Sequence, residues 1–149
     1  MTRTFLTRAA CALLVALAAC ADGPTLPSSS APFSQLDLRL GTGIEATAGK
    51  VLSVNYTGWL YDPTKTDLKG LQFDSSVGLE PLKFTLGTGS VIEGFDRGTA
   101  GMKVGGIRRI VIPPSLGYGP SRNNSIPAGA TLLFEVELLD VTDPVTAGR

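Results

Sequence analysis

The sequence contains no histidine among its 149 residues. Histidine is the commonest general base near neutral pH and the commonest neutral metal ligand, so its absence removes the usual candidates for both roles. Cysteine is almost as scarce, because the only two, Cys11 and Cys20, lie within the first twenty residues. The rest of the chain therefore has neither a disulfide nor a thiol nucleophile.

An excess of one charge is also missing. The chain has 13 basic and 13 acidic residues, and neither kind forms a run or a stripe. We therefore expect no nucleic acid partner, because such partners require a basic surface. The length favours one domain, and a hydrophobic content of 43% is enough for a core. The 18 glycines and 10 prolines favour many turns, and hence short strands rather than long helices.

The first residues have the features of an export signal. Arg3 and Arg8 precede an apolar run over residues 9–19, which is too short to span a bilayer, since a spanning helix needs ~20 residues. A short basic region followed by a short apolar region is typical of a secretory signal. We therefore predict a signal peptide over residues 1–19.

The end of this signal resembles the lipobox of bacterial lipoproteins. Leu17-Ala18-Ala19-Cys20 has small residues before a cysteine, and the resemblance implies lipidation of Cys20 as the first mature residue. The alternative is an ordinary signal peptide with a chance cysteine at its end. Residues 20–32 are rich in Pro, Gly and Ser and predict a flexible tether. The protein is then expected to be exported and membrane-anchored, facing the periplasm or the cell exterior.

Alternating apolar residues predict the strands of one sheet. The segments are 36–40, 51–60, 71–75, 82–86, 105–113 and 132–138. In the first of them, Leu36, Leu38 and Leu40 are expected to form the half-buried face. Together the segments favour an α+β domain in which an antiparallel sheet of about five strands is wrapped around one short helix.

That helix is predicted over residues 92–102. Ser90 is the expected N-cap, with Glu93 in the capping-box position. Gly94, Gly98 and Gly101 weaken the helix, each by ~1 kcal/mol relative to alanine. The helix therefore needs packing against the sheet to persist.

Three other features have structural interpretations. The Arg108-Arg109 pair is interpreted as part of a strand with one solvated and one salt-bridged arginine. Gly87-Thr88-Gly89 lacks the lysine of a phosphate loop and is better explained as a turn. Phe84 is assigned to the core, and Trp59 is expected to lie outside any pocket.

Five groups of short motifs follow one another between residues 54 and 138. They are Val54-Asn55-Tyr56-Thr57-Gly58-Trp59-Leu60, Phe73-Asp74-Ser75-Ser76, Phe84-Thr85-Leu86-Gly87 with Val91-Ile92-Glu93-Gly94-Phe95, Pro113-Pro114-Ser115-Leu116-Gly117-Tyr118-Gly119, and Ile126-Pro127-Ala128-Gly129-Ala130-Thr131-Leu132-Leu133-Phe134-Glu135-Val136-Glu137-Leu138. Each motif resembles a sequence motif of the FKBP-type peptidyl-prolyl cis-trans isomerases. The motifs also occur in the same order as in that family. Any one match is weak, but the ordered set is highly specific. The resemblance covers a domain over residues 33–142, which leaves a tail at 143–149.

The resemblance implies a half-barrel of antiparallel strands with a shallow aromatic pocket between sheet and helix. It implies that Asp74, Tyr118 and Tyr56 are catalytic. The substrate-binding residues that it implies are Tyr56, Phe73, Val91, Ile92, Phe95, Ile126 and Phe134, with Leu82 at the rim. Phe95 stands where the family usually has tryptophan.

The activity that the resemblance implies is rotation about the peptide bond before proline. Amide resonance sets the barrier at ~18–20 kcal/mol, and rotation breaks no σ-bond and removes no proton. An apolar pocket favours the twisted amide because its carbonyl is less polar than that of the planar amide. Such a site needs no cofactor and no metal. By analogy with the family, Tyr118 and the backbone N–H of Ile126 are expected to donate to substrate carbonyls. We further expect Asp74 to interact with the carbonyl carbon of the twisted amide and to hold Tyr56 through its hydroxyl.

The leading hypothesis is an isomerase that acts on Xaa-Pro bonds of exported proteins and assists their folding outside the cytoplasm. The alternative is a chaperone or assembly module that holds proline-containing peptides with little turnover. A third interpretation is a structural surface lipoprotein. The expected partners are proline-containing polypeptides and, through the lipid anchor, a membrane. Macrolide inhibitors of the family are expected to bind in the pocket, and the chain is expected to be a monomer.

Overall fold

The computed structural model describes residues 30–145. The predicted signal peptide, Cys20 and most of the predicted tether therefore lie outside the described residues. Six strands form one sheet: β1 (Ser34–Arg39), β2 (Val51–Tyr61), β3 (Lys69–Ser75), β4 (Leu82–Thr85), β5 (Ile107–Ile112) and β6 (Leu132–Thr142). One α-helix, α1 (Glu93–Thr99), and a short 3₁₀ helix, η1 (Pro114–Leu116), complete the elements of this part of the chain.

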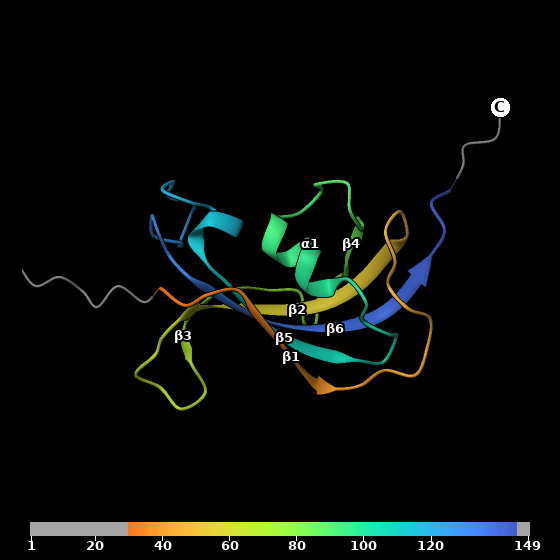
Figure 1. Ribbon diagram of the computed structural model, residues 1–149, viewed down its shortest axis with the longest axis horizontal. Helices are drawn as coiled ribbons and strands as arrows, with labels where there is room; N and C mark the ends of the chain where they lie inside the picture. The colour runs from red at the N-terminus through yellow and green to blue at the C-terminus, as the bar shows by residue number, and fades with distance from the viewer. Residues whose placement is uncertain (1–29, 146–149) are drawn as a thin grey trace, which may run out of the picture.

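All strand pairs are antiparallel, in the order β1-β5-β6-β2-β3. The long strand β2 carries β3 along its second half and β4 along its first half, on the same edge. The sheet is open, and α1 lies on one of its faces together with the connection between η1 and β6 (Figure 1). The α+β architecture is confirmed, with six strands rather than about five.

The core lies between α1 and the inner face of the sheet. Alternate residues of β2 and β6, such as Leu52, Val54, Val136 and Leu138, are fully buried there. This alternation is the period of two that a strand imposes on its side chains. Phe84 is also buried in this cluster, as the sequence predicts. Within residues 30–145 no helix has the length and apolar character needed to cross a membrane.

The glycines of α1 allow it to lie unusually close to β5. A Cβ atom at Gly94 would come within 2.3 Å of Cγ2 of Ile112, and one at Gly98 within 2.6 Å of Ile110. Both isoleucines are fully buried and cannot move away easily. The glycines therefore lower the intrinsic helix propensity but are required by the packing of helix on sheet.

Replacing Gly94 with alanine tests this close packing. Alanine is intrinsically the better helix former by ~1 kcal/mol, but overpacking a core costs ~1–3 kcal/mol. We expect Gly94→Ala to lower the free energy of unfolding, as measured by urea denaturation. The cost should shrink in an Ile112→Ala background, because the clashing atom is then absent. A stabilised Gly94→Ala variant would contradict the close contact.

The helix is shorter than predicted and begins differently. Its N-cap is Ile92, which makes no side-chain capping bond. The hydroxyl of Ser90 instead lies 2.6 Å from the hydroxyl of Thr88. The prediction of Ser90 as N-cap with a capping box was therefore wrong, because the tight turn before the helix uses this hydroxyl within the turn itself.

The leucines of the first strand are exposed rather than half-buried. Leu36 pairs with Arg109 on the outer face, whereas Asp37 pairs with Arg108 on the inner face. Leu36, Leu38 and Leu40 are 60%, 46% and 77% exposed. The alternation was predicted correctly, but the leucines were assigned to the inner face, which Asp37 occupies instead. The inward position is taken by an aspartate because the neighbouring strand presents an arginine there.

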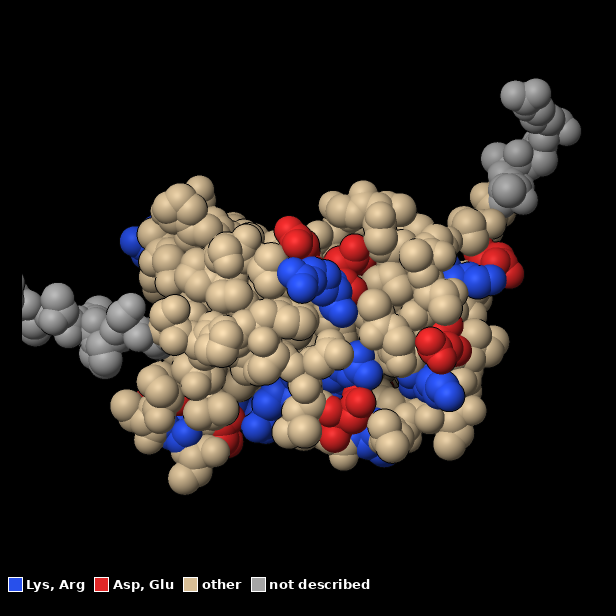
Figure 2. Space-filling view, viewed as in Figure 1, with Lys and Arg blue, Asp and Glu red and all other residues tan. Residues whose placement is uncertain are grey.

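Both arginines of the Arg108-Arg109 pair are salt-bridged, so the expectation of one solvated arginine was wrong. Arg108 lies on the inner face, 2.6 Å from Asp37, and its Nη1 donates to the carbonyl oxygens of Gly98 and Ala100. Arg109 lies on the outer face, 2.8 Å from Glu135. Acidic and basic side chains also lie next to one another over the face seen in Figure 2.

Candidate active site

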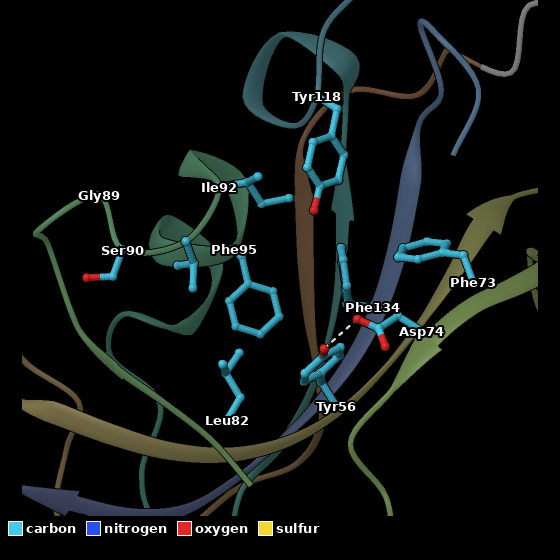
Figure 3. A pocket seen from close by; sticks show the side chains of 11 residues that line it. Tyr56, Phe73, Asp74, Leu82, Gly89, Ser90, Ile92, Phe95, Tyr118 and Phe134 are labelled. Atoms are coloured by element: carbon cyan, nitrogen blue, oxygen red, sulfur yellow. Dashed lines mark hydrogen bonds between the residues drawn. The ribbon is translucent and has the colours of Figure 1, made fainter. Parts of the chain in front are cut away.

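A cavity of about 480 Å³ opens between α1 and the sheet. Side chains from four strands, from α1, and from the connections before α1 and after η1 converge on it (Figure 3). The lining residues are Tyr56, Phe73, Asp74, Leu82, Gly89, Ser90, Val91, Ile92, Phe95, Tyr118 and Phe134. The structure therefore places every predicted catalytic and substrate-binding residue on this cavity except Ile126. Their chemical roles stay predictions.

The floor of the cavity is a cluster of edge-to-face aromatic rings. Phe95, only 3% exposed, has its ring centroid 5.8 Å from that of Tyr56, 5.2 Å from that of Phe134 and 5.7 Å from that of Phe84. Phe73 stands 5.6 Å from Phe134. Edge-to-face rings attract through their quadrupoles, so the cluster is stiff as well as apolar. Such a floor suits a compact apolar ring.

A glycine on β2 makes this arrangement of rings possible. A Cβ atom at Gly58 would lie 2.6 Å from the ring of Phe73 and 2.8 Å from the ring of Phe134. Any larger residue at this position would push the two rings apart. Gly58 therefore shapes the cavity wall although it does not line the cavity itself.

The polar groups of the cavity gather at one side. The hydroxyl of Tyr56 donates to Oδ2 of Asp74 over 2.6 Å, and the backbone N–H of Ser75 donates to Oδ1 over 2.9 Å. The first bond is the one the sequence predicts. Asp74 has no salt bridge to a lysine or arginine within residues 30–145. Both oxygens thus keep unused lone pairs.

Tyr118 supplies a second polar group. Its hydroxyl points into the cavity, opposite Tyr56 and Asp74 (Figure 3). It makes no hydrogen bond to another of residues 30–145, so it remains available to a bound molecule. The cavity therefore combines one donor hydroxyl and one carboxylate with an aromatic floor.

Burial raises the pKa of Tyr56 well above its usual value of 10.0, and the hydrogen bond to Asp74 and the charges of Asp74 and Tyr118 raise it further. Tyr56 therefore stays a neutral donor at physiological pH. A pKa that is higher in the folded state means that ionisation favours the unfolded state. The stability that the folded state gains from keeping Tyr56 protonated is fully present below pH ~10. It is lost as the pH rises above that value.

This pKa shift predicts a specific alkaline destabilisation. The free energy of unfolding of the wild type should fall more steeply between pH ~10 and ~11.5 than that of Tyr56→Phe, which has no proton to lose. Urea denaturation at half-unit pH steps would measure both slopes. Equal slopes for Tyr56→Phe and the wild type would contradict the shift.

Ile126 lies in a neighbouring cavity of about 200 Å³, which it lines with Asn123, Asn124 and Ser125. Its backbone N–H donates to the carbonyl oxygen of Asn123 over 2.7 Å. In this conformation the N–H expected to bind a substrate carbonyl is therefore already paired within the protein. The sequence motif identified the residue but not the tight turn that uses its N–H.

Two lining residues were missed by the sequence analysis. Gly89 and Ser90 were interpreted as a turn and as a helix cap, and both line the main cavity. Their only sequence signal is their position directly before Val91 and Ile92, which were recognised. Residues that border a site through backbone position carry little chemical signature of their own.

The fold and the site together define a class of protein. An open antiparallel sheet packs one short helix, and an aromatic hollow with a hydroxyl and a carboxylate at its edge lies between them. Such a hollow can accommodate a small apolar ring attached to a polar amide.

The comparisons with known proteins identify the class more closely. A family model described as "FKBP-type peptidyl-prolyl cis-trans isomerase" matches residues 42–139. An "FK506-binding protein" of Neisseria meningitidis serogroup B is 50% identical over 107 residues, which cover 70% of this chain and 92% of that protein. "FK506-binding protein 1" of Aspergillus oryzae is 44% identical over 105 residues, covering 68% of this chain and 90% of that protein.

Solved structures agree with the sequence relatives. FkpA from Escherichia coli is 38% identical with a TM-score of 0.64, over 74% of this chain and 48% of that chain. AtFKBP13 is 34% identical with a TM-score of 0.62, over 75% of this chain and 96% of that chain. The chain belongs to the family of FKBP-type peptidyl-prolyl cis-trans isomerases.

Proposed function

We propose that this isomerase acts on Xaa-Pro bonds of exported proteins, as a lipid-anchored enzyme that assists folding outside the cytoplasm. The observation that carries the activity is the aromatic hollow with the Tyr56–Asp74 pair and the free hydroxyl of Tyr118 at its edge. The observation that carries the location is the lipobox-like sequence ending at Cys20. The two parts are tested separately.

The proline ring of the substrate enters the aromatic floor between Phe95 and Phe134. Burial of the ring stabilises the complex by roughly 25 cal/mol per Å² of apolar surface removed from water. The flat faces and edges of the surrounding rings match the shape of a five-membered ring. The bond that rotates then lies at the polar side of the cavity, beside Asp74 and Tyr118.

The environment of that bond favours the rotated form. The planar amide is strongly polar because of resonance, and the twisted amide is less polar. An apolar surrounding therefore penalises the planar ground state more than the twisted state. The hydroxyl of Tyr118 donates to a substrate carbonyl and fixes the peptide. The carboxylate of Asp74, held by Tyr56, faces the carbonyl carbon of the twisted amide. Interactions stronger in the twisted state than in the planar state are the ones that raise turnover.

A macrolide of the FK506 type is proposed to occupy the same hollow. The relatives named above are called FK506-binding proteins. The cavity of about 480 Å³ offers such a macrolide an apolar floor with hydrogen-bonding groups at its edge. FK506 should then inhibit isomerisation competitively with the peptide.

The activity is tested with a proline tetrapeptide whose isomerisation is followed by a coupled protease. The purified chain should accelerate isomerisation well above the uncatalysed rate, which has a time constant of tens to hundreds of seconds. FK506 should abolish the acceleration. Peptide binding without acceleration would instead support the role of a peptide-holding module.

The anchor is tested by labelling the chain in bacterial cells with a radioactive fatty acid. The wild type should incorporate label and sediment with membranes, and Cys20→Ser should do neither. Cys11→Ser is the matched control, because it removes the other cysteine of the chain, and it should label normally. Incorporation of label into Cys20→Ser would overturn the assignment of the anchor.

A further inference from the structure

Exposed apolar side chains gather at one edge of the sheet, on β1 and the start of the loop that follows it. Leu36, Leu38, Leu40 and Ile44 are 60%, 46%, 77% and 62% exposed. They are four of the nine large hydrophobic residues that are exposed within residues 30–145, and they fall in nine consecutive positions. Single exposed apolar side chains are normal, but a contiguous group marks an interaction surface. We call these four residues the apolar edge.

The backbone of the apolar edge is poorly suited to pairing with a further strand. β1 is the outermost strand on one side of the sheet, next to β5. Its pairing with β5 shifts register between Asp37 and Arg39, so that Leu38 is skipped. A bulge and charged side chains on an edge strand are features that prevent strand addition. A partner of this edge is therefore bound through apolar surface rather than through backbone hydrogen bonds.

The charges beside the apolar edge cancel. The charged side chains of β1, Asp37 and Arg39, are both engaged in ion pairs, at 2.6 Å and 2.8 Å. Beyond β1, Glu45 and Lys103 face one another in a β-bridge and contribute one charge of each sign. Contact with this edge therefore depends on apolar burial and not on the charge of the partner.

The apolar edge begins where the proposed membrane tether ends. Ser34 starts β1, fourteen positions after Cys20, the residue proposed to carry the lipid. At ~3.3–3.6 Å per residue, even a fully extended segment of this length keeps β1 within about 50 Å of the bilayer. The tether thus gives the edge a high effective concentration at the lipid surface, so that contacts too weak to bind a free protein become populated.

The apolar edge and the main cavity lie on different sides of the molecule. β1 runs along the lower side of the domain in Figure 1, whereas α1 lies above the sheet. The main cavity opens between α1 and the sheet. Contact of β1 with a bilayer therefore leaves the cavity open to polypeptides on the side away from the lipid.

We propose that the apolar edge inserts into the interfacial region of the bilayer that holds the anchor and fixes the domain with its cavity turned away from the lipid. This inference rests on the lipid anchor of the proposed function and not on the isomerase activity. Lipid suits the surface because it buries leucine and isoleucine side chains without supplying a strand partner or a charge. A second copy of the chain would instead have to bring two interrupted edge strands together, each with Asp37 and Arg39 beside its leucines.

The test uses the full lipid-bearing chain in phosphatidylcholine vesicles, with one cysteine introduced for a fluorescent label that responds to polarity. The introduced thiol is free for labelling, because the lipid occupies that of Cys20. Leu36→Cys places the label on the apolar edge. Leu71→Cys is the matched control, since Leu71 is 65% exposed on β3, the strand at the other end of the strand order.

The label at position 36 should shift its emission to the blue and lose at least half of its intensity when the vesicles contain nitroxide-labelled lipid. The label at position 71 should do neither. Adding Leu38→Ser and Leu40→Ser should reduce the quenching at position 36 at least threefold. In 1 M NaCl the quenching should stay unchanged, because salt screens charges and leaves apolar burial intact.

The outcomes separate this inference from the proposed function. Absence of quenching at position 36 in a chain that floats with the vesicles, or equal quenching at positions 36 and 71, would overturn the inference and leave anchor and isomerase intact. Energy transfer between labelled copies without quenching by lipid would overturn it in favour of a second copy as the occupant. A chain that does not float with the vesicles would overturn the anchor, and this inference with it.

Discussion

Asp74→Asn is expected to lower kcat/KM for a proline peptide about a hundredfold, the scale at which one preorganised electrostatic contact acts in an active site. Asparagine keeps the size of the side chain and still accepts the hydrogen bond that Tyr56 donates to Asp74 over 2.6 Å. The change therefore removes the negative charge with little disturbance of shape. Since the charge is proposed to act on the twisted amide only, kcat should fall and KM should change little.

The control for this prediction is Asp67→Asn. Asp67 also accepts a backbone N–H, that of Lys69, through its Oδ1, but it lies outside both cavities. Its variant should have wild-type kinetics. Urea denaturation should show that Asp74→Asn unfolds at nearly the wild-type midpoint. An unchanged kcat in a folded Asp74→Asn would show that the carboxylate has no part in the rotation.

The site was largely predictable because its residues lie in ordered motifs. Tyr56, Phe73, Asp74 and Phe134 each stand within a recognisable strand sequence, and the structure brings them to one cavity. What could not be predicted depends on turn geometry. The N–H of Ile126 is occupied by a tight turn, and no residue pattern in the chain shows which of two partners a backbone group will choose.

The orientation of the strands was predictable in the centre of the sheet, where hydrophobic burial determines which side chains face inward. It was less predictable in the edge strand β1. In β2, β5 and β6 the alternating apolar residues face the helix, because hydrophobic burial there outweighs any single polar contact. In β1 all residues are exposed, so the leucines contribute little and the pairing of Asp37 with Arg108 sets the inner face. A charge pair across two strands far apart in sequence is invisible to periodicity.

Arg108 connects this edge strand to the helix that floors the site. Its guanidinium, with a side chain 9% exposed, bonds Asp37 through Nε and Nη2. Nη1 bonds the carbonyls of Gly98 and Ala100 at the C-terminal end of α1. A cation is favoured there by the helix dipole and satisfies carbonyls that the helix itself leaves unpaired. A helix of seven residues is marginal without such contacts.

Arg108→Met is therefore expected to lower the free energy of unfolding by about 3 kcal/mol, because it leaves a carboxylate and two helix carbonyls without their donor. For a domain of this size the melting temperature should fall by roughly 10–15 °C. Methionine keeps the apolar stem, so the loss isolates the guanidinium.

Arg109→Met is the control on the opposite face, where Glu135 retains Lys69 at 2.9 Å, and it should cost about 1 kcal/mol or less. Adding Asp37→Leu to Arg108→Met should recover part of the loss by removing the stranded charge, but not all, because the helix carbonyls stay unpaired. Equal melting temperatures for the two arginine variants would refute the claim that Arg108 holds α1, and with it Phe95, in position against the sheet.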